Sequence, residues 1–313
     1  MANYNQNSRI GTVFHGFSIP EKGFVLAGYA ALIEAHHLKV VAPDTLCIIG
    51  TKHKKYVDGR WNVFTPRHRP ENTLYGHLTF ALKYEGIDLA VLNALFQTIE
   101  AEELESIIRS EPTGIYSRKI WFLWEWLRDE QLELEDATKG NFVPLVSKLQ
   151  YEGKHVLSRR HRVRNNLPGT RNFCPLIRKT KKLEQYLDKK LSEEAVRNIG
   201  QTHPDLLSRA AAFLLLKDSK ASYTIEGETP PHSRIERWGR IIGAAGSRRL
   251  SIEEIEHLQT QVIADSRFMQ PGLRTEGGFV GEHDRTSGMP MPDHISARPD
   301  DLKTLMSGLI ETY

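Results

Sequence analysis

A hydroxyl and a carboxylate stand one helical turn apart near residue 225. Ser222 and Glu226 are four positions apart in a stretch with helical periodicity, so both side chains would lie on one face of a helix. Gly227 follows directly and suits a helix C-terminus, where a left-handed backbone is often required. The pair could present a hydroxyl and a carboxylate together. The alternative interpretation of Glu226 is an ordinary glutamate at a helix end.

A second candidate is the basic segment from Lys154 to Lys182, which has ten Lys or Arg residues and no acidic residue. Nucleic-acid binding would use Arg159, Arg160, Arg162 and Arg164 on phosphates and Asn165 and Asn166 on base edges. In the other interpretation these arginines bridge the two domains and pair with acidic side chains from elsewhere. We favour ion pairing, because the whole chain is nearly balanced, with 42 Lys and Arg against 39 Asp and Glu.

Several other classes of site find no support in the sequence. The chain has no Walker loop, no dinucleotide fingerprint, no H-E-x-x-H and no G-x-S-x-G. Cys47 and Cys174 lie far apart, which excludes a disulfide framework and a zinc ribbon and favours a reducing cytoplasm. No apolar run approaches the roughly 20 residues of a membrane helix, and the N-terminus lacks a secretory signal. We expect a cytoplasmic protein without a metal site and without membrane contact.

Hydrophobic periodicity predicts a mainly α fold, a helical bundle with small β-hairpins. Helices are expected over 20–38, 72–99 with an interruption at Gly86, 100–110, 116–128, 183–199, 205–226, 234–245, 251–264 and 298–312. A β-hairpin is expected near 46–66 around Asp58-Gly59, and the basic segment is expected to be mostly loop. Three tryptophans within 116–128 indicate a buried core helix, and Ser251 with Glu254 indicates a capped helix start.

Residues 222–227, SYTIEG, resemble the inhibitory motif of the Fic (filamentation induced by cAMP) family. Residues 274–281, RTEGGFVG, resemble that family's flap hairpin, with Phe279 in place of the usual Trp and Gly278 in place of a β-branched residue. Residues 289–313 then resemble the proline-rich stretch and the helix that precede its catalytic loop. Further segments resemble the N-terminal region of a longer bacterial subfamily: GHLTFALKYEGIDL, EPTGIYSRKIWFLWEWL, SRRHRVRNNLPGTRNFCPL and RAAAFLLLKDSKASYTIEGE.

The resemblance implies an N-terminal domain over 1–200 and the first part of a Fic domain over 201–313, with an inhibitory helix at 205–227 and a flap at 272–283. The full-length family transfers AMP from ATP, with Mg²⁺, to a Ser, Thr or Tyr hydroxyl of a target protein. Ser222, Glu226 and Gly227 would lie near ATP, with Glu226 autoinhibitory. The flap residues that would dock the target are Arg274, Gly278, Phe279, Val280 and Gly281.

One departure from the family dominates. Its catalytic motif, H-P-F-x-[DE]-G-N-[GK]-R, is absent, and the one His-Pro pair, His203-Pro204, lacks every later element. We therefore expect a truncated Fic protein that has no catalytic residue, binds no cofactor tightly and is inactive alone. An apolar stripe on the last helix makes a homodimer a further expectation. The alternatives are a nucleic-acid-binding or regulatory module built on residues 154–182 and an inert fragment.

Overall fold

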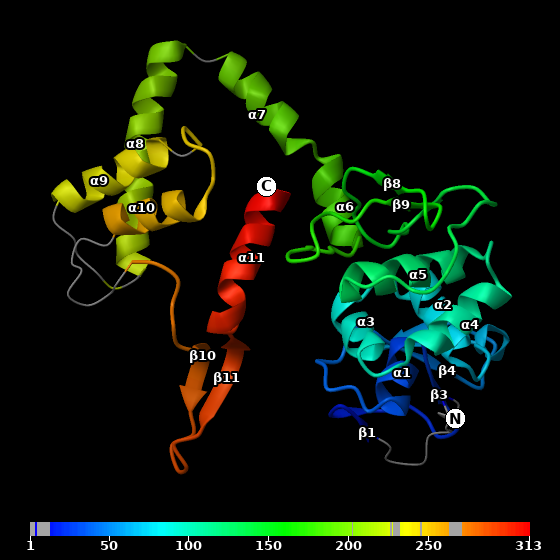
Figure 1. The fold of residues 1–313 in the computed structure, drawn as a ribbon. Coiled ribbons are helices and arrows are strands. Elements are labelled where there is room, and N and C mark those ends of the chain that lie inside the picture. The colour runs from blue at the N-terminus through cyan, green and yellow to red at the C-terminus, as the bar shows by residue number, and fades with distance from the viewer. Residues whose placement is uncertain are drawn as a thin grey trace. The chain divides into compact units, whose positions relative to one another are not determined.

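The computed structural model describes Tyr4, residues 13–201, 203–225, 227, 232–244, 246–262 and 271–313 (Figure 1). The chain forms two compact units, Met1–Lys179 and Thr180–Tyr313. Helices hold 43% of the residues and strands 14%. Among the residues described, no helix is both long enough and apolar enough to cross a membrane.

A four-stranded sheet with the order β3-β4-β6-β5 forms the base of the first unit. Its strands are β3 (Val25–Ala27), β4 (Leu46–Ile49), β5 (Tyr56–Asp58) and β6 (Trp61–Phe64). β4 pairs antiparallel with β3 and parallel with β6, so it lies in the interior of the sheet. All four β4 residues are buried, as a continuous apolar run in a central strand predicts.

The described part of this unit contains five α-helices: α1 (Tyr29–Ala35), α2 (Leu74–Tyr84), α3 (Leu89–Phe96), α4 (Ala101–Ser110) and α5 (Ile115–Arg128). Thr73 caps α2 by accepting from Gly76 N at 3.0 Å, and Asp88 caps α3 by accepting from Val91 N at 3.1 Å. Gly86, with φ 85°, separates the two helices where the sequence predicted an interruption. A short hairpin of β1 (Val13–Phe14) and β2 (Phe17–Ser18) and a 3-10 helix, η1 (Pro66–His68), complete this part.

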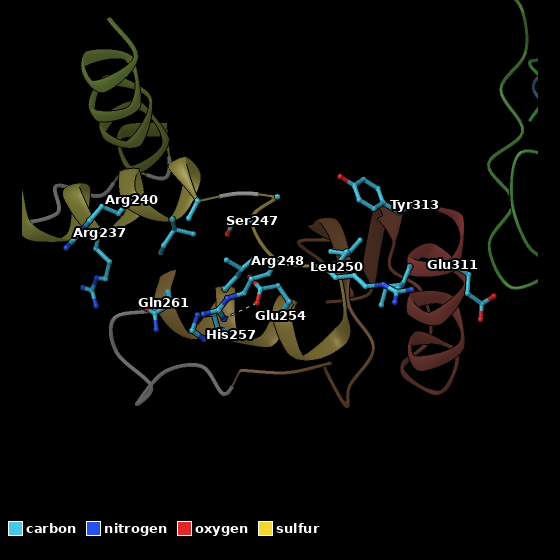
Figure 2. Close-up of a pocket in the computed structure, with 16 residues that line it drawn as sticks. Arg237, Arg240, Ser247, Arg248, Leu250, Glu254, His257, Gln261, Glu311 and Tyr313 are labelled. Atoms are coloured by element: carbon cyan, nitrogen blue, oxygen red, sulfur yellow. Dashed lines mark hydrogen bonds and ion pairs between the residues drawn. The ribbon is translucent and has the colours of Figure 1, made fainter. Parts of the chain in front are cut away.

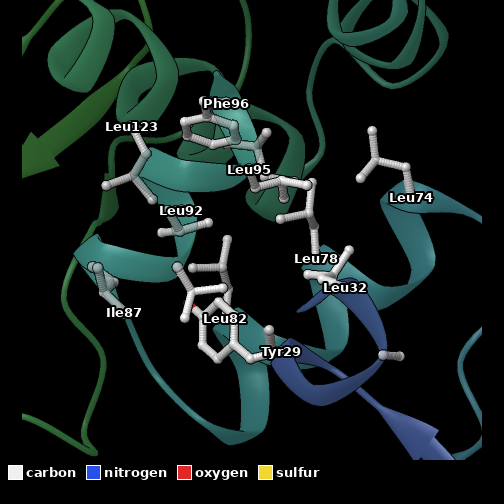
Figure 3. Packing of buried hydrophobic residues seen from close by; sticks show 14 of the residues in the cluster. Tyr29, Leu32, Leu74, Leu78, Leu82, Ile87, Leu92, Leu95, Phe96 and Leu123 are labelled. Carbon is white, nitrogen blue, oxygen red and sulfur yellow. The ribbon is translucent and has the colours of Figure 1, made fainter. Parts of the chain in front are cut away.

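The core of the first unit lies between these helices and the sheet (Figure 3). Leu78, Leu92 and Leu95 are fully buried there, beside Tyr29 from α1. Trp121 and Trp124 on α5 are also buried, which confirms the predicted core helix. A three-stranded sheet with the order β7-β9-β8 follows, from β7 (Val143–Pro144), β8 (Val156–Ser158) and β9 (Val163–Asn165).

The residues that the structure describes in the second unit form helices and one hairpin. Its elements are α6 (Lys181–Asp188), α7 (Leu191–Gly200), α8 (Pro204–Ile225), α9 (His232–Gly243), α10 (Ile252–Val262), β10 (Phe279–His283), β11 (Pro290–Ile295) and α11 (Pro299–Thr312). The predicted helix over 183–199 divides at Lys190, whose φ of 49° is left-handed. Among the described side chains of this unit, no large apolar one is buried.

The prediction of a mainly helical bundle is wrong, because the strands form four small sheets and the fold is mixed α/β. One reason lies in the segment predicted as a helix over 20–38. Gly23 and Gly28 have left-handed φ values of 83° and 59°, and β3 lies between them. The glycines isolate an apolar run too short for a helix, and this run joins the sheet instead.

The hairpin predicted near 46–66 is also differently paired. Asp58-Gly59 does form a tight turn, but the turn joins β5 to β6. The 46–49 run pairs with β6 in the parallel direction, which a hairpin cannot do. The short polar strand β5, which lacks a strong apolar signal, is the partner that the sequence did not indicate.

Candidate functional site

Helix α8 carries the predicted inhibitory motif near its C-terminus. The helix ends at Ile225, three residues after Ser222. Glu226 lies outside the described residues, as does the side chain of Ser222. Gly227 has a left-handed φ of 72°, and its N–H donates to Thr224 O at 3.1 Å, which agrees with the expected helix-end backbone.

Apolar side chains of α8 are exposed within the second unit. Phe213 is 65% and Leu214 is 52% exposed, although both are large apolar residues. α8 packs against α9, and α9 packs against α10. These contacts leave much of the α8 apolar face uncovered among the residues described, so the helix presents a surface rather than a closed core.

The predicted flap, residues 272–283, contains the first strand of the β10–β11 hairpin but not the second. The two strands of the hairpin pair antiparallel, with a register shift between Val280 and Gly281. Gly281 has φ 151°, and a Cβ there would lie 2.3 Å from Met291 O, so this position requires a glycine. Val280 is 64% exposed, and every residue of β11 is exposed. The second strand comes from the proline-rich stretch rather than from residues before 283.

The remaining flap residues hold the base of the hairpin. Gly278 O accepts from Ser296 N at 2.9 Å, and the Arg274 guanidinium donates to Ala297 O. The ring of Phe279 lies 5.2 Å from that of His283. At the tip, Asp284 Oδ1 accepts from Thr286 N and Ser287 N, which fixes the turn. The structure therefore brings the predicted flap residues together, but gives Arg274 a contact within the hairpin base.

An open pocket of about 1230 Å³ lies between α9, α10 and the end of α11 (Figure 2). Four arginines line it: Arg237, Arg240, Arg248 and Arg249. Arg248 forms an ion pair with Glu254 at 3.3 Å, and His257 lies beside them. Ser251 Oγ accepts from Glu254 N at 3.1 Å, which confirms the predicted cap of α10. The lining has an excess of positive charge, which favours anions.

The basic segment in the first unit contributes one strong ion-pair network. Arg160 donates to both oxygens of Glu125 at 2.8 to 3.1 Å and also pairs with Asp136 at 3.0 Å. His161 Nε2 lies 2.9 Å from the same Glu125 carboxylate, and Trp121 Nε1 donates to it at 2.7 Å. Arg160 is thus paired with acidic side chains of its own unit.

Glu125 is nearly buried, with 8% of its side chain exposed. Burial alone would raise the pKa of Glu125, but hydrogen bonds from His161, Arg160 and Trp121 lower it to about 2. The carboxylate is therefore charged at neutral pH and is satisfied on both oxygens. This network links α5 to the basic segment. Because Arg160 and His161 already bond the Glu125 carboxylate, they are not free to bind phosphate.

Other members of the basic segment are engaged to different degrees. Arg162 donates to Gly140 O, and the buried Asn166 accepts from Val146 N at 2.8 Å. Arg159 and Arg164 form no ion pair with another residue that the structure describes. Asn165 Oδ1 accepts from Leu167 N at 3.2 Å. Two of the four arginines and both asparagines proposed for nucleic acid are thus hydrogen-bonded within the protein.

A buried carboxyl group that the sequence did not indicate lies at Glu85. Its Oε2 accepts from Tyr29 N at 3.0 Å, and the Cys47 thiol is hydrogen-bonded to it. Burial raises the pKa of Glu85 to about 8, so the group is mostly protonated at neutral pH. Arg178 donates to the backbone oxygen of Glu85 instead of to its carboxyl group. These residues lie far apart in sequence, and no spacing rule could have joined them.

No protein-family model, curated protein or solved structure matches this chain. Function is therefore inferred from the residues and contacts of this chain. Within the described ranges, no three His, Cys, Asp or Glu side chains group as metal ligands.

Proposed function

We propose that residues 204–313 are the regulatory and target-docking part of a Fic-type protein adenylyltransferase. The observation that carries the proposal is the exposed β10–β11 hairpin, which stands between α10 and the proline-initiated helix α11. It supports the proposal because the family's flap occupies this place in the order of elements. The long helix α8, ending beside Glu226 and Gly227, supports it independently.

In this proposal, Glu226 is autoinhibitory. A carboxylate that pairs with an arginine makes a charge-assisted and often bidentate contact. While Glu226 occupies such an arginine, the γ-phosphate of ATP lacks that counter-charge and is not aligned for transfer. Ser222, one helical turn away, would orient the carboxylate. The target would be a protein with an accessible Ser, Thr or Tyr hydroxyl, and we propose the cytoplasm as the compartment because Cys47 and Cys174 are free thiols.

The exposed strands β10 and β11 would dock the target by strand pairing. A two-stranded hairpin has unpaired backbone groups on both outer edges, and an extended segment of another protein can add to such an edge. Val280 and Met291, which are 64% and 48% exposed, would contact side chains of the added segment.

ATP and Mg²⁺ are the cofactors that the resemblance implies, and the residues present do not fit them. The 313 residues contain no copy of H-P-F-x-[DE]-G-N-[GK]-R, which supplies the family's general base, Mg²⁺ ligand and phosphate-binding backbone. We therefore derive no transfer step for these residues alone. Labelled ATP with a bacterial lysate tests this expectation: Mg²⁺-dependent labelling of a target by the purified chain would contradict it.

The decisive experiment uses an extended protein in which a catalytic loop of that sequence and its helix follow residue 313. Glu226→Gly should raise self-labelling with labelled ATP about ten- to a hundredfold, since a hydrogen bond to a charged group contributes roughly 1.5–3 kcal/mol. Ser222→Ala should raise it less. Lys220→Ala, on the same helix, is the matched control and should change nothing. Equal or lower activity in a folded Glu226→Gly variant would contradict the proposal.

Docking is tested in the same extended protein. Val280→Asp should lower the labelling of a target without lowering self-labelling, because it changes the strand side chain and not the active site. Thr286→Ala, at the tip of the hairpin, is the control. Loss of both activities in a folded Val280→Asp variant would contradict a docking role.

A further inference from the structure

A cleft in the first unit has a different chemistry and is independent of the proposed transferase. It has a volume of about 510 Å³, within the range of small-molecule sites. The side chains that give it its character are Lys119, Lys148, His155, Arg164, Asn166 and Lys179, and we call it the basic cleft. Glu152 is the acidic residue among the described residues that line it.

The cations of the basic cleft lack acidic partners. Arg164, Lys148 and Lys179 form no ion pair with another described residue. Glu152 accepts a hydrogen bond from the Asn166 side chain. Arg160, four positions before Arg164, shows the contrast, because it meets Glu125 and Asp136. Glu152 offsets only part of the positive charge of Lys119, Lys148, Arg164 and Lys179, and such an excess of positive charge attracts anions.

Lys119 is the most informative of these residues because it is buried. It is 6% exposed, and its Nζ donates to Leu145 O at 3.0 Å. Its neighbour Arg118 satisfies its guanidinium with the carbonyls of Gly114, Asn141 and Arg162. Lys119 has three N–H donors, and no carboxylate offsets its burial, which lowers its pKa to about 8. A buried ammonium at the wall of a cleft is costly unless an anion compensates it.

The backbone around the cleft is held in place by hydrogen bonds. Asn166 Oδ1 accepts from Val146 N at 2.8 Å, and Gly153 N donates to Asn166 O at 2.9 Å. Lys179 N donates to Leu149 O at 2.9 Å, which fixes the last residue of the unit against this wall. The backbone that carries these cationic side chains is therefore already ordered, which reduces the entropy lost on binding.

We propose that the basic cleft binds the phosphoryl group of a small soluble anion. Several separate cations suit the several oxygens of a phosphate or diphosphate, and Arg164 can bind two of them at once. The shared chemistry fits a free diphosphate and the diphosphate end of a nucleotide. A nucleic acid is disfavoured, because the neighbouring Arg160 and Arg162 are occupied by protein groups.

Isothermal titration of the full 313-residue chain with pyrophosphate, at low salt and pH 8, tests the proposal. We expect saturable binding that Arg164→Ala and Lys148→Ala each weaken about five- to tenfold, as the loss of a charge-assisted contact predicts. Lys39→Ala, an exposed lysine outside the cleft, is the matched control and should leave the affinity unchanged. Citrate, with carboxylates in place of phosphates, should bind more weakly. ADP in a parallel titration distinguishes a nucleotide from a free diphosphate.

A second readout isolates Lys119. An anion beside its ammonium favours the charged form, so binding at pH 8 should take up a fraction of a proton, seen as a difference between buffers of unlike ionisation enthalpy. Lys148, Arg164, Lys179, His155 and Glu152 face the same cleft, so Lys119→Met is compared with Lys148→Ala. Uptake should vanish in Lys119→Met and persist in Lys148→Ala.

The results that would contradict phosphoryl binding in the basic cleft differ from those that would support it. Absence of pyrophosphate binding at millimolar concentration, or binding unaffected by Arg164→Ala and Lys148→Ala, would overturn the proposal. Tighter binding of a short DNA duplex that is lost in the same variants would assign the cleft to nucleic acid. If Lys119→Met does not fold, the two exposed variants still decide whether the cleft binds.

Discussion

The two units of the chain bury their side chains in very different ways. Every buried apolar side chain that the structure describes lies between Tyr4 and Leu167, in the first unit. In the second unit, the described residues that are buried are Gly239 and Gly308. Amphipathic helices gain most of their stability from packing an apolar face, so helices that leave this face exposed are only marginally stable. The first unit thus has the features of a stable domain, whereas the described helices of the second unit leave their apolar side chains exposed to solvent.

This difference predicts where substitutions act. In the first unit, the buried carboxylate of Glu125 is held by several hydrogen bonds, so single changes there should be costly. In the second unit, comparable groups are exposed, so the same kinds of change should cost little. Matched pairs of variants, one in each unit or one at each kind of position, test this difference.

The largest effect is expected at Glu125. Glu125→Ala removes the partner of Arg160 and His161 and leaves buried donors unsatisfied, which should lower the free energy of unfolding by about 3–5 kcal/mol. Asp301→Asn removes the exposed partner of Arg298 in the second unit and should have no measurable effect. Urea denaturation measures both. Equal effects would contradict the contrast between the units.

The pH dependence of the first unit follows from two carboxyl groups with opposite shifts. The folded pKa of Glu85 is raised to about 8, so its contribution is present below pH 4.5 and is lost as the pH rises toward 8. The shift corresponds to a loss on the order of 4 kcal/mol. Glu85→Gln should flatten this decline when urea denaturation is followed between pH 5 and 8.5. An unchanged slope would mean that Glu85 titrates normally.

Glu125 affects the stability of the first unit at acidic pH. Its folded pKa is lowered to about 2, so its contribution is present above pH 4.5 and is lost as the pH falls toward 2. The loss should be about 3 kcal/mol. Together the two groups predict that the first unit is most stable near pH 5, as followed by tryptophan fluorescence from α5. A maximum above pH 8 would contradict the assignment of Glu85, and unchanged stability between pH 4.5 and 2 would contradict that of Glu125.

The next largest effect on stability is expected at Gly28, compared with Gly23. Gly28→Ala would place a Cβ 1.7 Å from Glu85 Oε2 at a left-handed φ of 59°, and should cost about 3 kcal/mol. Gly23→Ala has a similar φ of 83° but meets no atom within 4 Å, so it should cost only about 1 kcal/mol of backbone strain. Thermal unfolding compares them. Similar costs would show that backbone strain alone governs both positions.

The smallest effect concerns helix caps. Thr73→Ala and Ser251→Ala each remove one cap hydrogen bond, which typically contributes about 1 kcal/mol to its helix. Thr73→Ala should lower the global stability of the first unit. Ser251→Ala should increase hydrogen exchange in α10 only, because that helix is not part of a closed core. A global effect of Ser251→Ala would indicate that the second unit is more cooperative than its burial suggests.

Local patterns in the sequence were sufficient for most helices. Periodicity and capping signals predicted α4, α5 and α10 to within a few residues, since these signals lie within the elements themselves. The strands were harder. β5 and β8 are short and polar, and they are held by partners elsewhere in the chain rather than by their own pattern.

Candidate sites are likewise predictable from the sequence only where their residues lie within one element. Ser222 and Glu226 could be paired from spacing because they share one helix, although the structure does not describe Glu226. Lys119 and Arg164 are 45 positions apart, and the packing of α5 against β9 brings their elements together. A sequence without an alignment gives charge and periodicity, but it does not give the contacts between distant segments.

The close approach of Gly28 to Glu85 also constrains how this protein could change over evolutionary time. A Cβ at position 28 would overlap the Glu85 carboxyl group, so a side chain at position 28 requires Glu85 to move or to be replaced. Even with a smaller side chain at position 85, the left-handed φ of 59° at position 28 would still disfavour a residue with a Cβ. In any set of descendants, positions 28 and 85 should therefore vary together, although they are far apart in the sequence.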